Sequence, residues 1–253
     1  MGPNLDSGRF FIEMAEQIVD LQFKGLRLIQ NDKVLKFGTD AVLLASYVTI
    51  HKRETLVDLG TGTGIIPVLI SGRVRASMTG IDIQKDACEL AERNVELNGL
   101  DNITIIHGDL REIEKYVDHA DVVTMNPPYD KPEAGEMNKD EKIRIARYEV
   151  ECDLDDIASA AAKLLSTGGR FYMIHRAYRM AEIIAKLREH SLEVKEIRPI
   201  VKKAEAEPRY ILIKATKDGL SGMRLLPSLV IYDSEGNYTP EMRKIYHMEE
   251  NDG

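Results

Sequence analysis

Three glycines at alternate positions, Gly60, Gly62 and Gly64, lie in the sequence DLGTGTG, between an apolar run that favours a strand and one that favours a helix. Glycine lets the backbone turn tightly and approach a ligand closely, and the free N–H groups at the start of a helix suit a carboxylate or a phosphate. A dinucleotide-binding loop would follow the pattern G-x-G-x-x-G. This loop departs from that pattern, because Ile65 and Pro67 stand where its last glycine would be. Taken alone, a glycine-rich loop is a weak signal of function.

Two aspartates follow the next two predicted strands. Asp82 stands 22 residues after Gly60, the spacing expected of an acid that binds the hydroxyl groups of a ribose. Asp109 ends the following strand. Because ligands bind at the carboxyl ends of the strands in an open α/β sheet, both carboxylates should face the same crevice as the glycine loop. Each aspartate alone is more simply a helix cap or a turn residue, but the three features together predict a nucleoside site.

A third feature is the sequence NPPY at residues 126–129, which we call the elbow. It follows the apolar run ADVVT and precedes a polar stretch. Proline has no N–H to donate to a strand ladder, and it forces the preceding residue, Asn126, into an extended conformation. A buried strand should therefore end here in a stiff turn that carries an amide and an aromatic ring. The simplest alternative is a turn that only closes the strand.

Alternating strands and helices must position these features. The patterns predict two short strands around an Asn-Asp turn in 25–37, strands at 54–60, 76–83, 102–109, 120–124, 170–175 and 209–215, and helices at 39–48, 65–74, 85–100, 154–169 and 178–190. We expect Thr39 or Asp40 to cap the first helix and Asp153 to cap the helix at 154–169. The alternation indicates an α/β fold with a parallel sheet covered on both faces.

The formal net charge of the 253 residues is −8, but it is unevenly distributed. Residues 170–217 contain 12 Lys and Arg against 6 Asp and Glu. An acidic chain argues against indiscriminate binding of nucleic acid, whereas a basic segment within it permits a localised contact with phosphates. Ordinary surface solvation explains these charges equally well.

Composition also indicates the cellular compartment. No apolar stretch is long enough to span a membrane, and the N-terminus lacks the apolar core of a secretory signal. Cys88 and Cys152 form no CxxC pair and are more simply packing residues, and the six histidines are scattered. We therefore expect a cytoplasmic protein without a disulfide framework, a metal site or a membrane partner.

The motifs VDLGTGTG, GIDI, HGDL and NPPY, in this order, resemble those of the class I S-adenosylmethionine-dependent methyltransferases, and NPPY resembles the branch that methylates amino groups. The sequences LQFKGLRLIQNDKVLKFGTDAVLLASY, ARYEVECDLDDI and LVIYDSEGNYTPEMRKIY are similar to bacterial tRNA(Val) adenine-N6 methyltransferases and their Gram-positive relatives. The resemblance implies a Rossmann-like fold: a mostly parallel seven-stranded sheet with helices on both faces and an N-terminal β-hairpin extension. It also implies S-adenosylmethionine as the cofactor.

The resemblance divides the chain into three parts. Residues 1–50 would form an N-terminal extension with a leader, a helix, the hairpin and a buried helix. Residues 51–217 would form the methyltransferase domain, and residues 218–253 a tail of a hairpin and a helix packed on that domain.

The resemblance further implies which residues bind the cofactor. The glycine loop would take its methionine end, with Asp58 organising the amino group there, and Asp82 would hold the ribose. Ile83 would pack on the adenine, and Asp109 with Leu110 would bind its edge. Thr39, together with Asp40, would line the methionine side or cap the helix. The implied set is Thr39, Asp58, Gly60, Thr61, Gly62, Gly64, Asp82, Ile83, Asp109 and Leu110.

By the same resemblance the elbow would hold a planar amino group, with Asn126, Pro127 and Tyr129 as the catalytic residues. The side-chain oxygen of Asn126 and the carbonyl of Pro127 would accept the two N–H bonds and draw the nitrogen lone pair out of the ring. Proline stiffness would preorganise both acceptors, and the ring of Tyr129 would stack on an extruded base. The sulfonium is already activated, so neither a metal nor a strong base is needed.

We expect RNA, in particular tRNA, as the partner. Residues 130–147 form a long polar stretch that we interpret as a lid over the substrate. The candidate RNA contacts in the lid and in the basic segment are Lys139, Lys142, Arg144, Arg176, Arg179, Lys202 and Lys203.

Two alternatives stay open. The first is another NPPY methyltransferase, which acts on guanine N2 of ribosomal RNA or on a glutamine of a release factor. The second is a nucleoside-binding or RNA-binding module without catalysis, which the intact elbow disfavours. The glycine spacing disfavours a NAD-linked dehydrogenase.

Overall fold

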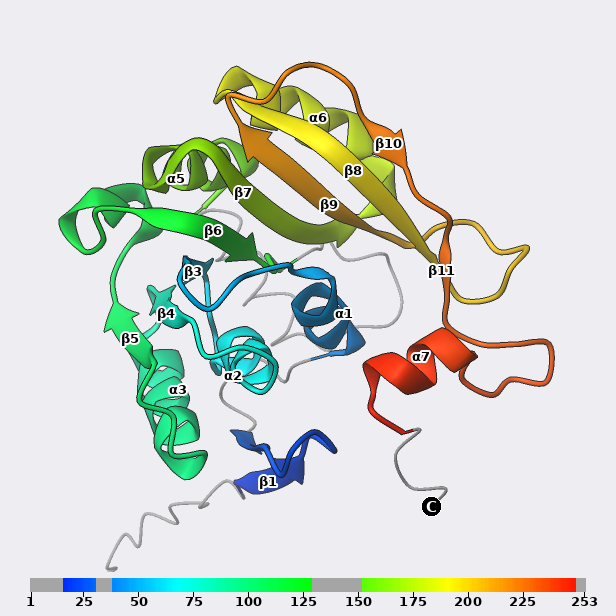
Figure 1. Ribbon diagram of the computed structural model, residues 1–253, viewed down its shortest axis with the longest axis horizontal. Coiled ribbons are helices and arrows are strands. Elements are labelled where there is room, and N and C mark those ends of the chain that lie inside the picture. The colour runs from blue at the N-terminus through cyan, green and yellow to red at the C-terminus, as the bar shows by residue number, and fades with distance from the viewer. Residues whose placement is uncertain (1–15, 31–37, 129–151, 249–253) are drawn as a thin grey trace, which may run out of the picture.

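The computed structural model describes residues 16–30, 38–128 and 152–248, which form a central sheet and a separate two-stranded hairpin (Figure 1). Five neighbouring strands of the central sheet run parallel, in the spatial order β5-β4-β3-β6-β7. These strands are β3 (Thr55–Leu59), β4 (Ser77–Asp82), β5 (Ile103–His107), β6 (Ala120–Met125) and β7 (Leu165–Arg176). The chain starts in the middle at β3, moves to one edge, and then returns to build the other half from β6. The strand order therefore reverses between β3 and β6.

The other end of the sheet is partly antiparallel. β9 (Tyr210–Lys217) runs antiparallel between β7 and β8 (Leu192–Val201). Two strands of the C-terminal tail, β10 (Arg224–Leu225) and β11 (Leu229–Val230), pair in parallel with β8. The mostly parallel sheet is confirmed, but its predicted size of seven strands is wrong. It has nine strands within the described residues, because the tail extends the sheet instead of only packing on it.

Helices cover both faces of the sheet (Figure 1). Because successive side chains of a strand point to opposite faces, Leu56 packs in one hydrophobic cluster and Val57 in the other. Both are buried, which explains why the strands read as continuous apolar runs. The first cluster contains residues of α1 (Thr39–Tyr47), α2 (Ile65–Ser71), α3 (Lys85–Leu97) and α7 (Pro240–Ile245). The second contains residues of α5 (Leu154–Leu164), α6 (Met180–Glu189) and the short helix η1 (Leu110–Lys115).

The N-terminal hairpin is present, and its turn lies before the predicted Asn-Asp turn, which falls outside the described residues. β1 (Gln17–Asp20) pairs antiparallel with β2 (Arg27–Gln30), so the connection is the segment 21–26. This turn is closed by a hydrogen bond from the Leu21 amide to the Leu26 carbonyl, and Gly25 adopts a φ of 72° within it. The predicted second strand, 33–37, lies outside the described residues.

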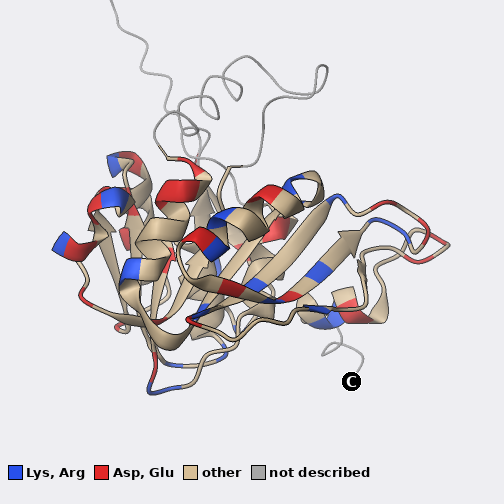
Figure 2. Cartoon of the chain, turned by 90° about the horizontal axis from the view of Figure 1, so that it is seen from above, with Lys and Arg blue, Asp and Glu red and all other residues tan. Residues whose placement is uncertain are grey.

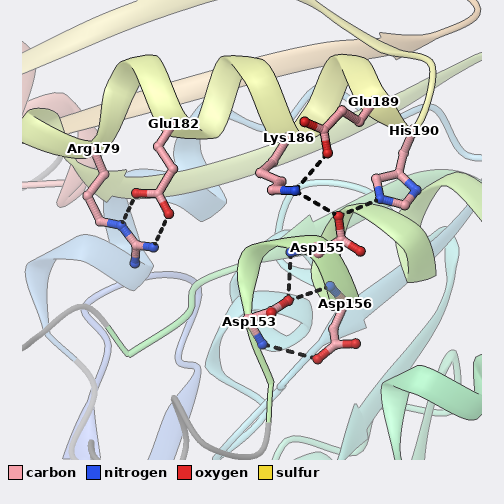
Figure 3. Close-up of polar contacts among 8 residues, drawn as sticks. All are labelled: Asp153, Asp155, Asp156, Arg179, Glu182, Lys186, Glu189 and His190. Carbon is pink, nitrogen blue, oxygen red and sulfur yellow. Dashed lines mark hydrogen bonds and ion pairs between the residues drawn. The ribbon is translucent and has the colours of Figure 1, made fainter.

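The predicted cap of α5 is confirmed. The Asp153 carboxylate accepts hydrogen bonds from the backbone amides of Asp155 and Asp156, and the Asp156 side chain accepts one from the Asp153 amide (Figure 3). The predicted end of this helix near residue 168 is wrong. Leu165 already has extended backbone angles and pairs with Ala120, so β7 begins directly after the helix.

Basic and acidic residues alternate along the peripheral helices instead of separating into two faces, and the strands carry mainly uncharged residues (Figure 2). Within the described residues, we find no helix that is both long and apolar enough to cross a membrane.

Candidate functional site

Most of the predicted site residues meet at the carboxyl edge of the parallel strands. Leu59, the last residue of β3, pairs with Met125, the last of β6, and Asp82 of β4 pairs with His107 of β5. The residues that follow these four strands therefore leave the sheet at the same level. The edge includes the point between β3 and β6 where the strand order reverses, which is where open α/β sheets bind ligands.

The glycine loop (residues 60–64) requires its glycines. Gly60, Gly62 and Gly64 have φ values of 61°, 55° and 77°, in the left-handed region that side chains with a Cβ rarely adopt. The Thr61 amide donates to the Ile81 carbonyl at 2.9 Å, which attaches the loop to the end of β4. A Cβ on Gly62 would meet no atom within 4 Å. The middle of the loop therefore faces open space that a ligand can approach.

Asp82 is buried beside this loop, with 4% of its surface exposed. One carboxylate oxygen accepts the Gly62 amide and the other accepts the Gln84 amide, each at 2.9 Å. Burial raises the pKa of Asp82, while the hydrogen bonds from Gln84 and Gly62 lower it. Each carboxylate oxygen can accept a second hydrogen bond, so two hydroxyl groups could bind here.

A pocket joins this carboxylate to the ends of β4 and β5. We call it the cofactor pocket after the role that the sequence predicts for most of its residues. It is lined by Gly60, Ile81, Asp82, Ile83, Gly108, Asp109, Leu110 and Cys152. Five of these eight residues belong to the set expected from the sequence. The geometry thus gathers residues from three different strand ends around one apolar and acidic pocket.

Asp109 lies at the rim of the cofactor pocket and is bound twice by Arg111. Its carboxylate caps η1 by accepting the Arg111 amide at 2.9 Å, and it also pairs with the Arg111 guanidinium, whose Nε lies 3.0 Å away. These hydrogen bonds from Arg111 hold the pKa of Asp109 below its usual range. Asp109 is therefore a cap and a pocket residue at the same time.

Asp58 lies beneath the glycine loop and is not a lining residue of the cofactor pocket. It is fully buried, and its two oxygens accept hydrogen bonds from the hydroxyls of Thr61, at 2.7 Å, and Thr124, at 2.6 Å. Burial raises its pKa to about 7. Since Thr124 lies on β6 two residues before Asn126, Asp58 links the glycine loop to the strand that carries the elbow.

Asn126 leaves β6 towards the first turn of α1. Its side-chain nitrogen donates to the Asp40 carboxylate at 3.2 Å. The predicted capping of α1 by Thr39 or Asp40 is wrong, because Gly38 occupies the N-cap position without a side-chain bond. Thr39 is exposed at the start of α1 and hydrogen-bonds the Tyr246 side chain of the tail. Pro127 is buried, whereas Tyr129 lies outside the described residues.

Comparison with known proteins identifies the family. The methyltransferase domain family matches residues 50–245. The chain belongs to this family. It is a class I methyltransferase that uses S-adenosylmethionine, as the order of its motifs implied.

Two relatives match this methyltransferase over most of their length, and both carry the name tRNA1(Val) (adenine(37)-N6)-methyltransferase. The protein from Flavobacterium johnsoniae is 30% identical over 87% of this chain and 94% of its own length. The protein from Histophilus somni is 27% identical over 89% of this chain and 94% of its own length. Among solved structures, a predicted O-methyltransferase from Agrobacterium tumefaciens matches with a TM-score of 0.67 and 22% identity, over 82% of this chain and 95% of that one. The structural match shows the fold.

The described residues fit S-adenosylmethionine. The open face of Gly62 leaves room for the polar methionine chain, and Asp82 has acceptor capacity left for a ribose. The apolar side chains of Ile83 and Leu110 suit a flat base. No group of three or more His, Cys, Asp or Glu suited to a metal ion occurs in the described part of the chain.

A larger cavity of about 730 Å³ lies between α1, β8, β9 and α7. It contains none of the predicted site residues, and four of its charged side chains form two pairs, Arg198 with Glu241 and Lys214 with Glu196. The residues predicted from the sequence to carry the chemistry therefore lie outside this cavity.

Four of the predicted RNA contacts lie in described segments, at the same edge of the sheet as the elbow. Arg176 ends β7 with its guanidinium 4.5 Å from the centre of the Tyr210 ring, and Tyr210 also pairs with Ile200 near the end of β8. Arg179 pairs with Glu182, its neighbour on α6 (Figure 3). Lys202 and Lys203 are exposed just after β8. The other three, Lys139, Lys142 and Arg144, lie with the predicted lid outside the described residues.

Sequence reasoning missed several residues of the site. Cys152 lines the cofactor pocket, where burial raises the pKa of its thiol to about 12, so it packs there as a neutral group. Its place directly before the Asp153 cap was the available signal. Asn94 of α3 donates to the Thr63 carbonyl at 3.0 Å and so supports the glycine loop. The contact between Asp40 and Asn126 had no signal, because 86 residues separate the two.

Proposed function

We propose that this methyltransferase methylates the exocyclic N6 amino group of an adenine in tRNA. The observation that carries the proposal is the register of Leu59 with Met125, which sets the elbow directly beside the glycine loop. The names of the two relatives support the substrate, because the chain spans 94% of each of them.

The elbow residues provide what an exocyclic amine requires. Its lone pair is delocalised into the ring, so it is a poor nucleophile until acceptors hold both N–H bonds. The oxygen of Asn126 and the carbonyl of Pro127 are such acceptors, and they follow a fully buried strand end. Acceptors that are fixed before the reaction stabilise its transition state without reorganisation. When bound, S-adenosylmethionine supplies a methyl group that its sulfonium already activates. Tyr129 would stack on the base that enters.

The residues of the cofactor pocket would each bind a different part of S-adenosylmethionine. In this proposal the glycine loop receives the methionine end, and the Asp82 carboxylate accepts the ribose hydroxyls. Ile83 and Leu110 enclose the adenine, with Asp109 at its edge. Asp58 would act from below the loop by holding Thr61, and Thr39 would line the methionine side.

We also propose where the protein works and what it contacts. A tRNA substrate implies the cytoplasm and a contact surface at the carboxyl edge of β7 and β8. Lys202 and Lys203 are exposed there, and Arg176 is buried at the end of β7. Residues 51–217 would carry the catalysis.

Mass analysis of nucleosides tests the proposal. tRNA from cells with the gene intact, deleted and restored as Asn126→Ala should contain N6-methyladenine only in the first case. Purified protein should then methylate tRNA from the deletion strain. Methylated guanine in ribosomal RNA, or a methylated glutamine in a release factor, would replace the substrate while keeping the elbow chemistry. If the deletion strain keeps every methyl modification of the wild type, methylation is not the function of this protein in the cell.

A further inference from the structure

The side chain of Asn126 has two ends of similar shape and opposite character. Its oxygen accepts hydrogen bonds and its nitrogen donates them. A target amine can use only the oxygen, so an amide turned by 180° would present the wrong end. In the structure the nitrogen lies against Asp40, at 3.2 Å from its carboxylate. Since a carboxylate only accepts hydrogen bonds, it selects the nitrogen end and turns the oxygen away from α1.

The Asp40 carboxylate lies close to the backbone at the start of α1. Its other oxygen lies so close to Gly38 that a Cβ there would stand 2.5 Å from it. Gly38 has a φ of −106°, which any residue can adopt, so its lack of a side chain serves space and not backbone conformation. Asp40 lies in the first turn of α1, where backbone N–H groups and the helix dipole attract an acceptor.

We propose that Asp40 is a positioning residue for the methyl transfer: it fixes the amide of Asn126 with the oxygen directed to the target amine. The proposal rests on the proposed function, because it gives that oxygen its role. Asp40 itself need touch neither the cofactor nor the substrate.

The first test compares turnover with cofactor binding. Asp40→Asn keeps the shape but removes the acceptor-only character, and Asp40→Ala removes the contact. Both should lower kcat for tRNA about tenfold, the usual weight of one hydrogen bond to a charged group. The dissociation constant for S-adenosylmethionine should stay within twofold. Asp86→Asn, an exposed acid in the first turn of α3, is the matched control for the helix dipole and should keep full activity.

The second test asks whether Asp40 acts through Asn126. In the Asn126→Ala background, adding Asp40→Ala should cost almost nothing more, so the two effects should not multiply. Exchanging the two residue types between the positions is a more decisive test. Asn126→Asp alone sets two carboxylates against each other and should be slow. Combined with Asp40→Asn, the donor and acceptor are swapped, one oxygen still faces the amine, and activity should recover at least fivefold over Asn126→Asp.

The outcomes separate this inference from the proposed function. If the wild-type protein methylates no tRNA, the proposed function fails before any variant is compared. If it does methylate tRNA, but Asp40→Asn retains the wild-type kcat, or the Asp40 and Asn126 effects multiply, Asp40 has no positioning role. Melting curves for each variant show whether a loss of activity is a loss of folding. A variant that melts early is replaced by Gly38→Ala, which should displace the carboxylate and lower kcat in the same way.

Discussion

The contacts that build the cofactor pocket join residues close in the sequence, whereas those around the elbow join residues far apart. Asp82 binds Gly62, 20 residues away, and Asp109 binds Arg111, two residues away. On the elbow side, Asn126 binds Asp40 across 86 residues, and Thr124 binds Asp58 across 66. The hydrogen bonds at the cofactor pocket are thus local, and of its lining residues Cys152 comes from a distant part of the chain. The amine side depends on the packing of α1 and β3 against β6, so it should be the more sensitive half to distant changes.

Asn126→Ala should have the largest effect on turnover and should leave cofactor binding almost unchanged. Turnover on tRNA should fall about 10²–10³-fold, the usual cost of one preorganised hydrogen bond in a site that excludes water. Affinity for S-adenosylmethionine should change by no more than a few-fold, because the cofactor pocket is built without this residue. Single-turnover kinetics and calorimetry measure the two quantities. A wild-type rate would reduce the elbow to a stiff end of a strand.

Asp58 connects the glycine loop to β6, and its titration should affect the stability of the fold. Its pKa is about 7 in the folded chain against 3.8 ordinarily, mainly because of burial. Between these values the folded chain keeps a proton that the unfolded chain has lost, so this group lowers stability as the pH rises from about 4 to 7. Asp58→Asn cannot ionise and should gain on the order of 2–4 kcal/mol relative to wild type over that range. Denaturant unfolding at several pH values measures this.

A matched control for Asp58 lies on β6. The Asp121 carboxylate accepts hydrogen bonds from the amide and the hydroxyl of Thr55. These hydrogen bonds, the one from the amide most of all, lower the pKa of Asp121. Its stabilising contribution is present at neutral pH and is lost as the pH falls through its folded pKa. Asp121→Asn should therefore lose stability relative to wild type towards neutral pH, the opposite sign. Parallel curves for the two variants would remove Asp58 as the buried titrating group.

Asp82→Ala should affect the cofactor half alone. The lost acceptors should cost on the order of 1–3 kcal/mol in binding of S-adenosylmethionine and of its demethylated product. Binding of tRNA should not change, because the residue lies on the far side of the glycine loop from the predicted RNA contacts. Calorimetry with each ligand checks both statements, and equal cofactor affinity in the two proteins would exclude Asp82 from the site.

The smallest effect is expected at the RNA contacts. Replacing both Lys202 and Lys203 by Ala should weaken tRNA binding a few-fold and lower its salt dependence by roughly 0.7–0.9 log unit per lost phosphate contact. Lys52 and Arg53 are a matched control pair, because they are exposed before β3, at the opposite edge of the sheet. Filter binding at several salt concentrations compares the pairs. An equal slope for both would assign Lys202 and Lys203 to surface solvation.

The local half of the site could be predicted from the sequence, since glycine conformations, strand ends and caps leave a signature within a few residues. The glycine loop, Asp82 and the Asp153 cap lie where their patterns indicated. β8 left no such signal, because its half-buried Glu193, Lys195 and Glu196 gave the segment a surface composition. The hairpin turn was hidden for a related reason. Gln22 and Lys24 adopt φ values of 53° and 50° there, which their residue types do not announce.

The tail strands β10 and β11 have a consequence for how the protein behaves in a crowded solution. Without them, the ten residues of β8 would form a long unpaired edge, and such an edge invites pairing with another copy of the chain. Each tail strand pairs over only two residues, and Pro227 between them has no N–H to offer. The tail therefore occupies the edge without creating a new continuous one, and it should disfavour edge-to-edge self-association.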